Sequence, residues 1–194
     1  MAKQGVCGHF MHARTGLSTP YLGPEWMDCI RATVKKSAEA GVEAWLYDED
    51  NWPSGFAGGL VSGRGPEYLQ RCLRAELLEV PAGATQVELP VGLTTDVVAL
   101  FASADPLPEP ASFRQLPVTQ GAAKIELPGN EFRSVVVFVL ELFDMRFAQE
   151  AHIAGGYVDT LNPMVTEAFI ETTYEAYKRE VGEEFGKTVP GIFT

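Results

Sequence analysis

An apolar strand that runs directly into an acidic loop constrains the fold of this chain more than any other feature. Residues 42–47 are rich in β-branched and aromatic side chains, which predicts a strand. Asp48, Glu49 and Asp50 follow at once, and Trp52 precedes a Pro-Ser-Gly turn. Parallel α/β folds present their chemistry at the carboxyl ends of strands. We therefore expect a functional loop here.

Two interpretations of this loop stay open. Three acids by themselves also fit a solvated turn on the surface. Trp52 favours a binding site, because an indole face beside carboxylates suits the apolar face and the hydroxyls of a sugar ring. In an extended chain Asp48 and Asp50 share one side and Glu49 lies on the other.

The residues before this strand predict a strand–helix–strand unit. Residues 6–11 indicate a short strand, and residues 24–40 indicate a helix. Pro24 suits its first turn, Gly41 suits its end, and an apolar stripe recurs every four residues at Trp26, Ile30, Val34 and Ala38. Such a unit requires parallel strands joined by a right-handed crossover.

The middle of the chain has a different character. Residues 66–79 have leucines at every fourth position (69, 73 and 77), which predicts a short helix. From about residue 80 to 141, short β-rich runs alternate with prolines and turns, which predicts a small antiparallel sheet or sandwich inserted into the α/β fold. The expected strands are 86–91, 96–102, 123–127 and 134–142.

The α/β pattern returns near the end of the sequence. Residues 157–161 indicate a brief strand, and Asp159 at its end is a candidate pocket residue. Asn162 is a good N-cap and Pro163 a good first residue for a helix that ends near Gly182. Residues 189–194 then indicate the start of another strand.

The charge of the chain excludes some partners. Its formal net charge is -11 over 194 residues, with a sequence pI near 4.7. Without a basic stripe, such a chain is repelled by the phosphates of nucleic acids and by anionic membrane surfaces. The longest apolar run, residues 135–140, has the length of a strand and not of a membrane span. We expect neither nucleic acid nor membrane as a partner.

Cysteine usage and the start of the sequence bear on location. Cys7, Cys29 and Cys72 are scattered and odd in number, which predicts neither a disulfide framework nor a zinc site. Residues 1–6 lead into a strand without the apolar core of a signal peptide. The default expectation is a cytoplasmic location, and export of a longer parent protein stays open.

Several short stretches of the sequence resemble one family of enzymes. The stretches 9–17, 19–22 and 45–55, then 161–163, 185–187 and 190–194, resemble the glycoside hydrolases of the α-L-rhamnosidase type (family 106 and its relatives). The ordered set of motifs is more specific than any one of them. The resemblance covers residues 5–62 and 157–194, and the β-rich insert matches only in kind.

The resemblance implies a (β/α)8 barrel that hydrolyses plant or bacterial polysaccharides and glycosides with carboxylate acid/base chemistry. We expect a partial TIM-type barrel with an inserted antiparallel β subdomain. Residues 1–79 would form the first βα units, residues 80–150 the insert, and residues 151–194 a further unit that stops at the end of a strand. Relatives continue from that strand into an acid-bearing loop.

The resemblance also places candidate residues around a sugar. Asp48 and Glu49 are the candidate catalytic carboxyls, although the catalytic pair would be incomplete. The candidate substrate-binding residues are His12, Arg14, Asp50, Trp52 and the independently suggested Asp159.

The spacing of these residues narrows their roles. Asp48 and Asp50 would lie on one side of a sugar, whereas hydrolysis needs two carboxyl groups that face each other across the bond. His9 and His12 point to opposite faces of a strand, so a shared metal is not expected. Some relatives bind calcium, but Trp52 stands where a calcium loop has its third ligand. We expect no cofactor, with calcium as the alternative.

Two functions follow. The first is an incomplete glycoside hydrolase domain with a carbohydrate substrate. The second is a non-catalytic carbohydrate-binding or interaction module. An open part of a barrel would expose a sheet edge and an apolar face, so a homo-oligomer is the expected protein partner in that case.

Overall fold

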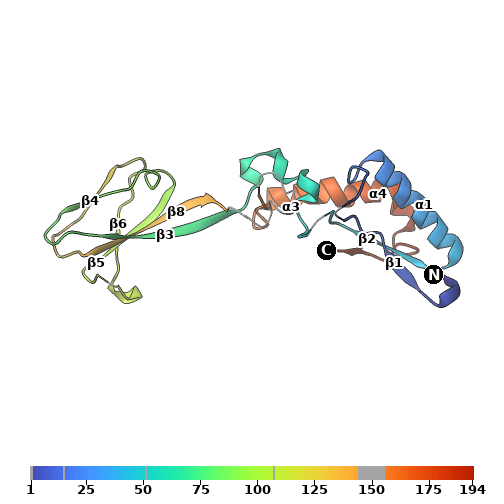
Figure 1. Cartoon of the computed structure of the whole chain (residues 1–194), viewed down its shortest axis with the longest axis horizontal. Helices are drawn as coiled ribbons and strands as arrows, with labels where there is room; N and C mark the ends of the chain where they lie inside the picture. Colours follow the sequence, from blue (N-terminus) through green and yellow to red (C-terminus); the bar gives the residue numbers. More distant parts are fainter. Residues whose placement is uncertain (1, 15, 51, 107, 144–155) are drawn as a thin grey trace. The chain divides into compact units, whose positions relative to one another are not determined.

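The chain folds into two compact units. The computed structural model describes residues 2–14, 16–50, 52–106, 108–143 and 156–194 (Figure 1). The first unit combines residues 1–70 with residues 143–194, and the second is the continuous segment Arg71–Leu142. The second unit is thus an insertion into the sequence of the first.

The first unit is built on a small parallel sheet. Its strands are β1 (Gly8–Phe10), β2 (Glu43–Tyr47) and β9 (Ile192–Phe193), in the order β1-β2-β9. Phe10 lies opposite Trp45, and Leu46 lies opposite Ile192. The parallel pairing predicted for the first two strands is confirmed. Within the described residues this sheet has three strands and does not close into a barrel.

Helix α1 (Pro24–Ala40) connects β1 to β2 and has the predicted bounds. Pro24 begins it, and Gly41 ends it in the left-handed conformation, with φ of 66° and N–H bonds to the last carbonyls. Its buried face contains Trp26, Ile30 and Val34 as predicted. Ser37 continues that face instead of Ala38, because a helix has about 3.6 residues per turn, so positions spaced by four drift slowly around it.

A second helical segment covers the same sheet. It consists of α3 (Pro163–Phe169), a π-helical turn η6 (Ile170–Tyr174) and α4 (Glu175–Val181). Asn162 caps it as predicted, because its Oδ1 accepts a hydrogen bond of 3.1 Å from the Met164 N–H. Its apolar face meets α1 and β2 in a shared core of Met11, Ala13, Trp26, Met27, Ile30, Val34, Ala44, Leu46, Ala176, Tyr177, Val181 and Val189.

Short 3₁₀ turns complete both units. They are η1 (Ala2–Gln4), η2 (Ala57–Gly59), η3 (Ser62–Arg64), η4 (Pro66–Tyr68), η5 (Pro110–Ser112) and η7 (Gly182–Glu184).

The second unit is antiparallel, as its turn-rich sequence predicts. One sheet has the order β3-β8-β5-β6, and a separate pair joins β4 to β7. The bounds are β3 (Arg71–Glu79), β4 (Gln86–Glu88), β5 (Val97–Ser103), β6 (Arg114–Leu116), β7 (Lys124–Glu126) and β8 (Ser134–Leu142). Its core includes Leu89, Leu100, Leu116, Ile125, Phe132, Val135, Val137 and Val139.

Two sequence predictions are wrong. Residues 66–79 were expected as a helix, but they form the turn η4 and then strand β3, which pairs with β8 along its whole length. Residues 157–161 were expected as a strand, but only Val158 makes an isolated bridge, to Leu69. Because β3 is a strand of the antiparallel sheet, the second unit starts at Arg71 and not at residue 80. Residues 144–150 of the expected insert lie outside the described residues.

Candidate functional site

Asp48 is the most buried polar residue of the acidic loop. It follows the last residue of β2, and its exposed fraction is 0%. Its Oδ1 accepts a hydrogen bond of 2.6 Å from Ser54, and its Oδ2 accepts one of 2.8 Å from the Tyr174 hydroxyl. Both oxygens therefore have a donor, as a buried carboxylate requires. Asp48 is held in place and does not face a ligand.

Glu49 shares the same serine. Ser54 Oγ lies 2.6 Å from Asp48 Oδ1 and 3.0 Å from Glu49 Oε1. A hydroxyl has one hydrogen to donate, so a second full hydrogen bond needs a proton on a carboxyl group. Burial raises the pKa of Glu49, and the charge of Asp48 raises it further, while Ser54 and Arg14 act in the opposite direction. Glu49 is the carboxyl of this pair suited to hold that proton.

Tyrosines from distant parts of the chain surround the two acids. The Tyr157 hydroxyl donates a hydrogen bond of 2.6 Å to the Ser54 carbonyl, which fixes the turn after Trp52. Burial, together with the hydrogen bond to Asp48, raises the pKa of Tyr174 to about 12. Burial and the charge of Glu49 also raise the pKa of Tyr157. These hydroxyls stay protonated near neutral pH and act as donors.

A pocket opens beside Glu49. It has a volume of about 440 Å³ and is lined by Tyr47, Glu49, Trp52, Pro53, Ser54, Tyr157, Phe193 and Thr194. Glu49 is 7% exposed and Trp52 is 69% exposed. The pocket thus combines aromatic walls with one carboxyl group and one hydroxyl that is bonded to it.

The aromatic wall is a stack on the sheet. Tyr47 of β2 stacks on Phe193 of β9, with ring centroids 4.7 Å apart and planes inclined by 24°. Tyr47 also stacks on the ring of His12, with ring centroids 3.6 Å apart and planes inclined by 15°. Because each ring packs against another, the wall beside Glu49 is held in one orientation.

The other predicted residues lie around the pocket without lining it. Burial and then the charge of Arg14 lower the pKa of His12, whose ring supports Tyr47. Arg14 itself is exposed, and its charge acts on Glu49. The Asp50 carboxylate lies against Gly58, where a Cβ would come within 2.9 Å of Oδ2. Asp159 Oδ1 accepts a hydrogen bond from the Leu161 N–H at 3.2 Å and has a local turn role.

Sequence reasoning missed three members of the site. Ser54 stands in the recognised loop but was not a candidate. Tyr157 and Tyr174 are separated from their partners by 103 and 126 residues, so only the fold brings them to the acids. The one local signal concerns Ser54, a small hydroxyl residue in the turn shortly after the acidic run.

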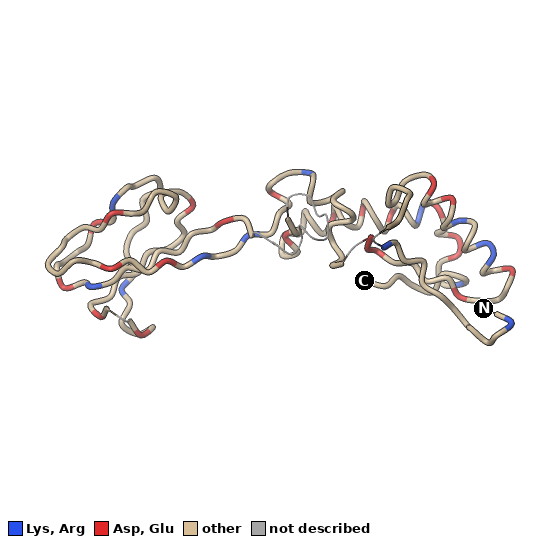
Figure 2. Tube along the Cα trace, viewed as in Figure 1, with Lys and Arg blue, Asp and Glu red and all other residues tan. Residues whose placement is uncertain are grey.

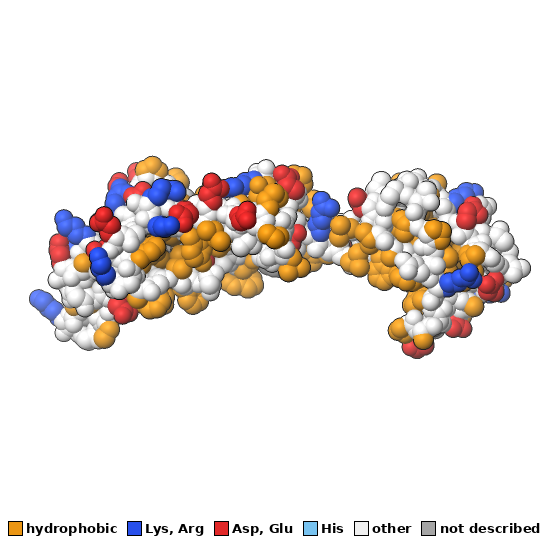
Figure 3. Space-filling view, turned by 180° about the vertical axis from the view of Figure 1, so that it is seen from behind, with side chains coloured by type: hydrophobic (Ala, Val, Ile, Leu, Met, Phe, Trp, Pro, Cys, Tyr) orange, Lys and Arg blue, Asp and Glu red, His pale blue; other side chains and the backbone are white. Residues whose placement is uncertain are grey.

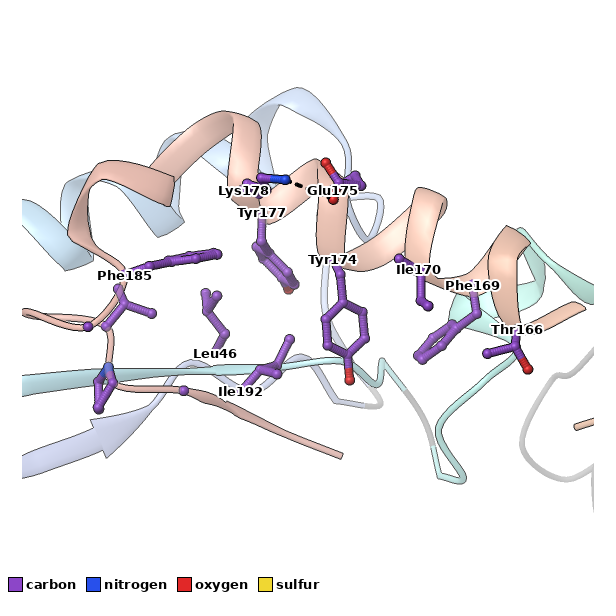
Figure 4. A pocket seen from close by; sticks show the side chains of 14 residues that line it. Leu46, Thr166, Phe169, Ile170, Tyr174, Glu175, Tyr177, Lys178, Phe185 and Ile192 are labelled. Carbon is purple, nitrogen blue, oxygen red and sulfur yellow. Dashed lines mark hydrogen bonds and ion pairs between the residues drawn. The ribbon is translucent and has the colours of Figure 1, made fainter. Parts of the chain in front are cut away.

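A larger and more apolar groove lies on the helix-covered side of the sheet. It has a volume of about 680 Å³, and Figure 4 shows Leu46 and Ile192 on the strands facing Phe169, Tyr174 and Tyr177 on the helical segment. Tyr174 connects the two regions, because its ring lines the groove and its hydroxyl bonds Asp48. An ion pair between Lys178 and Glu175, at 3.1 Å, stands at its rim (Figure 4).

The raised pKa of Glu49 predicts a pH-dependent stability. A carboxyl with a raised pKa in the folded state stabilises the protein below the ordinary glutamate pKa of about 4.3, and this contribution is lost as pH rises through the folded pKa. Glu49→Gln cannot ionise. Relative to the native protein, this variant should therefore gain unfolding free energy as pH rises from 4 to 8, measured by urea unfolding.

Glu39→Gln is the matched control. The hydrogen bond from Lys36, together with its charge, lowers the pKa of Glu39, so its ionised form is the favoured one in the folded state. That variant should change its stability relative to the native protein in the opposite direction over the same pH series. A Glu49→Gln difference that is constant with pH would contradict a raised pKa.

The described residues contain no cluster of three or more His, Cys, Asp or Glu that could ligate a metal. Among the helices in the described ranges, none has both the length and the apolar character to cross a bilayer. Comparison with family models, with curated proteins and with solved structures finds no match for this chain.

Proposed function

We propose that the first unit binds a carbohydrate in the pocket beside Glu49, as part of a glycoside hydrolase of the α-L-rhamnosidase type. The observation that carries this proposal is the joining of aromatic rings and a hydrogen-bonded carboxyl in one cavity of about 440 Å³. Trp52 and Tyr157 offer flat apolar surfaces to the C–H face of a sugar, and Glu49 offers a polar group for its hydroxyls. Mostly apolar pockets with a few oriented polar groups are typical ligand sites.

Glu49 suits the role of a general acid in such an enzyme. A raised pKa keeps the proton on the carboxyl until it is given to the leaving oxygen. Hydrolysis also needs a second carboxyl across the scissile bond. Asp48 does not suit that role, because it is fully buried and both its oxygens already accept hydrogen bonds. The second carboxyl would come from outside the described pocket.

The arrangement of the first unit supports a partial (β/α)8 barrel as the framework. Three parallel strands stand side by side in their sequence order, and helices α1 and α3–α4 each lead into the following strand. The acidic loop follows the carboxyl end of β2, where barrel enzymes have their catalytic residues. The antiparallel unit would then be an insertion between the second and third strands.

A non-catalytic carbohydrate-binding module is the second candidate. It is favoured by a specific observation: Glu49 is the only carboxylic acid among the residues that line the described pocket. One carboxyl is enough to bind a sugar hydroxyl but not for the paired acid and base of hydrolysis.

Titration with L-rhamnose tests the proposal. We expect calorimetric binding by the native chain, and a dissociation constant about fivefold higher for Trp52→Ala, because a stacking surface contributes on the order of 1 kcal/mol. Phe185→Ala is the control, because it removes a 42% exposed aromatic ring that does not line this pocket. The absence of binding at millimolar sugar, or equal losses in both variants, would refute it.

Hydrolysis of an aryl α-L-rhamnoside separates the two candidates. Turnover that Glu49→Gln abolishes would support the enzyme. Binding without turnover would support the module, since the pocket would then be complete for recognition only.

A further inference from the structure

Strand β3 forms a long, accessible edge of the second unit. In the order β3-β8-β5-β6 it pairs with β8 on one side, and no other strand in the described residues pairs with its outer side. It has nine residues, whereas β6 at the opposite edge has three. Leu73 is 56% exposed and Leu77 is 49% exposed. Natural proteins seldom leave so long an edge strand with exposed leucines unpaired.

The register with β8 shows which backbone groups face outward. The Val80 N–H bonds the Arg133 carbonyl at 2.9 Å, and the Phe143 N–H bonds the Gln70 carbonyl at 2.9 Å. Even-numbered residues of β3 therefore direct their N–H and C=O groups toward β8, because these directions alternate along a strand. The odd-numbered residues, from Arg71 to Glu79, present theirs at the outer edge.

We propose that two copies of this chain pair antiparallel through β3, with Ala75 of each copy next to the two-fold axis. The sequence RCLRAELLE is complementary to itself in this register. Arg71 lies opposite Glu79 of the other copy, and Leu73 lies opposite its Leu77. Arg74 lies opposite its Glu76. Each outward-facing residue exchanges two backbone hydrogen bonds with its opposite residue.

The charges also select this register over its neighbours. The register between the two copies can shift only by two residues at a time, because odd-numbered residues must stay opposite odd-numbered residues for their outward N–H and C=O groups to bond. A step in one direction places Arg74 directly opposite Arg74 of the other copy. A step in the other direction places Glu76 opposite Glu76. Like charges directly opposite are unfavourable, so the proposed register is the only one of these three without such a pair.

The surroundings of the strand fit a second copy. Arg74 already bonds Glu141 at 2.8 Å and also contacts Glu76, yet its side chain stays 36% exposed. It can therefore reach a carboxylate of the other copy. Along β3 two arginines, Arg71 and Arg74, come before two glutamates, Glu76 and Glu79. Figure 2 shows basic and acidic positions on this part of the chain. Figure 3 shows hydrophobic side chains at the surface of the second unit, and pairing would cover the exposed Leu73 and Leu77.

Sedimentation of the full chain at several concentrations tests this inference. We expect a reversible dimer with twice the 21.1 kDa mass of the chain. Arg71→Glu and Glu79→Arg each place like charges opposite each other twice in the symmetric pair. Either variant should therefore weaken dimerisation at least about tenfold. The double variant Arg71→Glu/Glu79→Arg restores opposite charges and should recover native association.

A control at the other edge keeps the test specific. Arg114→Glu makes the same charge change on β6 of the same sheet and should leave the dimer unchanged. Circular dichroism confirms that each variant is folded. A native chain that stays monomeric up to about 100 μM would overturn the inference, because even a weak interface with micromolar affinity would be formed at that concentration. A double variant that stays as weak as the single ones would also overturn it.

Discussion

Asp48→Ala should lower the unfolding free energy of the first unit by about 3 kcal/mol. The substitution removes the acceptor of two short hydrogen bonds, from Ser54 and from Tyr174. Hydrogen bonds to a charged group contribute roughly 1.5–3 kcal/mol each, and the two half-buried hydroxyls recover part of this by binding water. Urea unfolding followed by tryptophan fluorescence measures the loss, because Trp26, Trp45 and Trp52 all belong to the first unit.

Asp48→Asn is the matched control for this effect. It keeps the volume and one carbonyl acceptor but removes the charge, so we expect about half the loss. The pKa of Tyr174, about 12 in the native protein, should fall in both variants, which ultraviolet titration of tyrosine detects. It should not fall to the ordinary value, because burial is the larger cause of the shift. An alanine variant with native stability would contradict a structural role for Asp48.

Helix α1 shows what local sequence determines. Its start at Pro24 and its end before Gly41 depend on the backbone preferences of those two residues, and its apolar stripe needs only the helical repeat. None of these signals requires a partner elsewhere in the chain. The bounds Pro24–Ala40 could therefore be predicted without a structure. The same reasoning holds for the N-cap Asn162.

Strand β3 shows where local sequence is ambiguous. Leu69, Leu73 and Leu77 are spaced by four, which suits one face of a helix. Four is also a multiple of two, so Leu73 and Leu77 equally share one face of a strand. The pairing of β3 with β8 decides between the two, and every pair in it joins residues more than 50 positions apart in the sequence, from Glu79 with Ser134 to Arg71 with Leu142. That pairing is non-local and leaves no mark in the local spacing.

The site was predictable in its position and not in its geometry. The loop after β2 was identified, and it does border a pocket through Glu49 and Trp52. Strand alternation was expected to separate Asp48 from Glu49, but β2 ends at Tyr47, so both side chains reach Ser54. The burial of Asp48 could not be foreseen either, because it depends on a tyrosine from the distant helical segment.

Tyr177→Ala should cost the first unit about 4 kcal/mol of unfolding free energy. Tyr177 is fully buried, and its ring points from α4 toward the sheet (Figure 4). Large aromatic residues in such positions cost about 3–5 kcal/mol when they are cut back to alanine, because transfer energy is lost and a cavity remains. Native domains have about 5–15 kcal/mol in total, so this variant should be close to unfolding at 37 °C. Thermal unfolding followed by tryptophan fluorescence measures it.

Tyr177→Phe separates the ring from its hydroxyl. The hydroxyl accepts a hydrogen bond of 3.1 Å from Trp26 Nε1 and donates one of 3.2 Å to the Tyr47 carbonyl. Its removal leaves the Trp26 N–H and the Tyr47 carbonyl without this hydrogen-bond partner, which should cost about 1.5 kcal/mol. The Tyr47 carbonyl belongs to the last residue of β2, immediately before the acidic loop. If Tyr177→Phe also weakens sugar binding while the unit stays folded, the hydroxyl positions the loop. If binding is unchanged, Ser54 and Tyr174 position it without Tyr177.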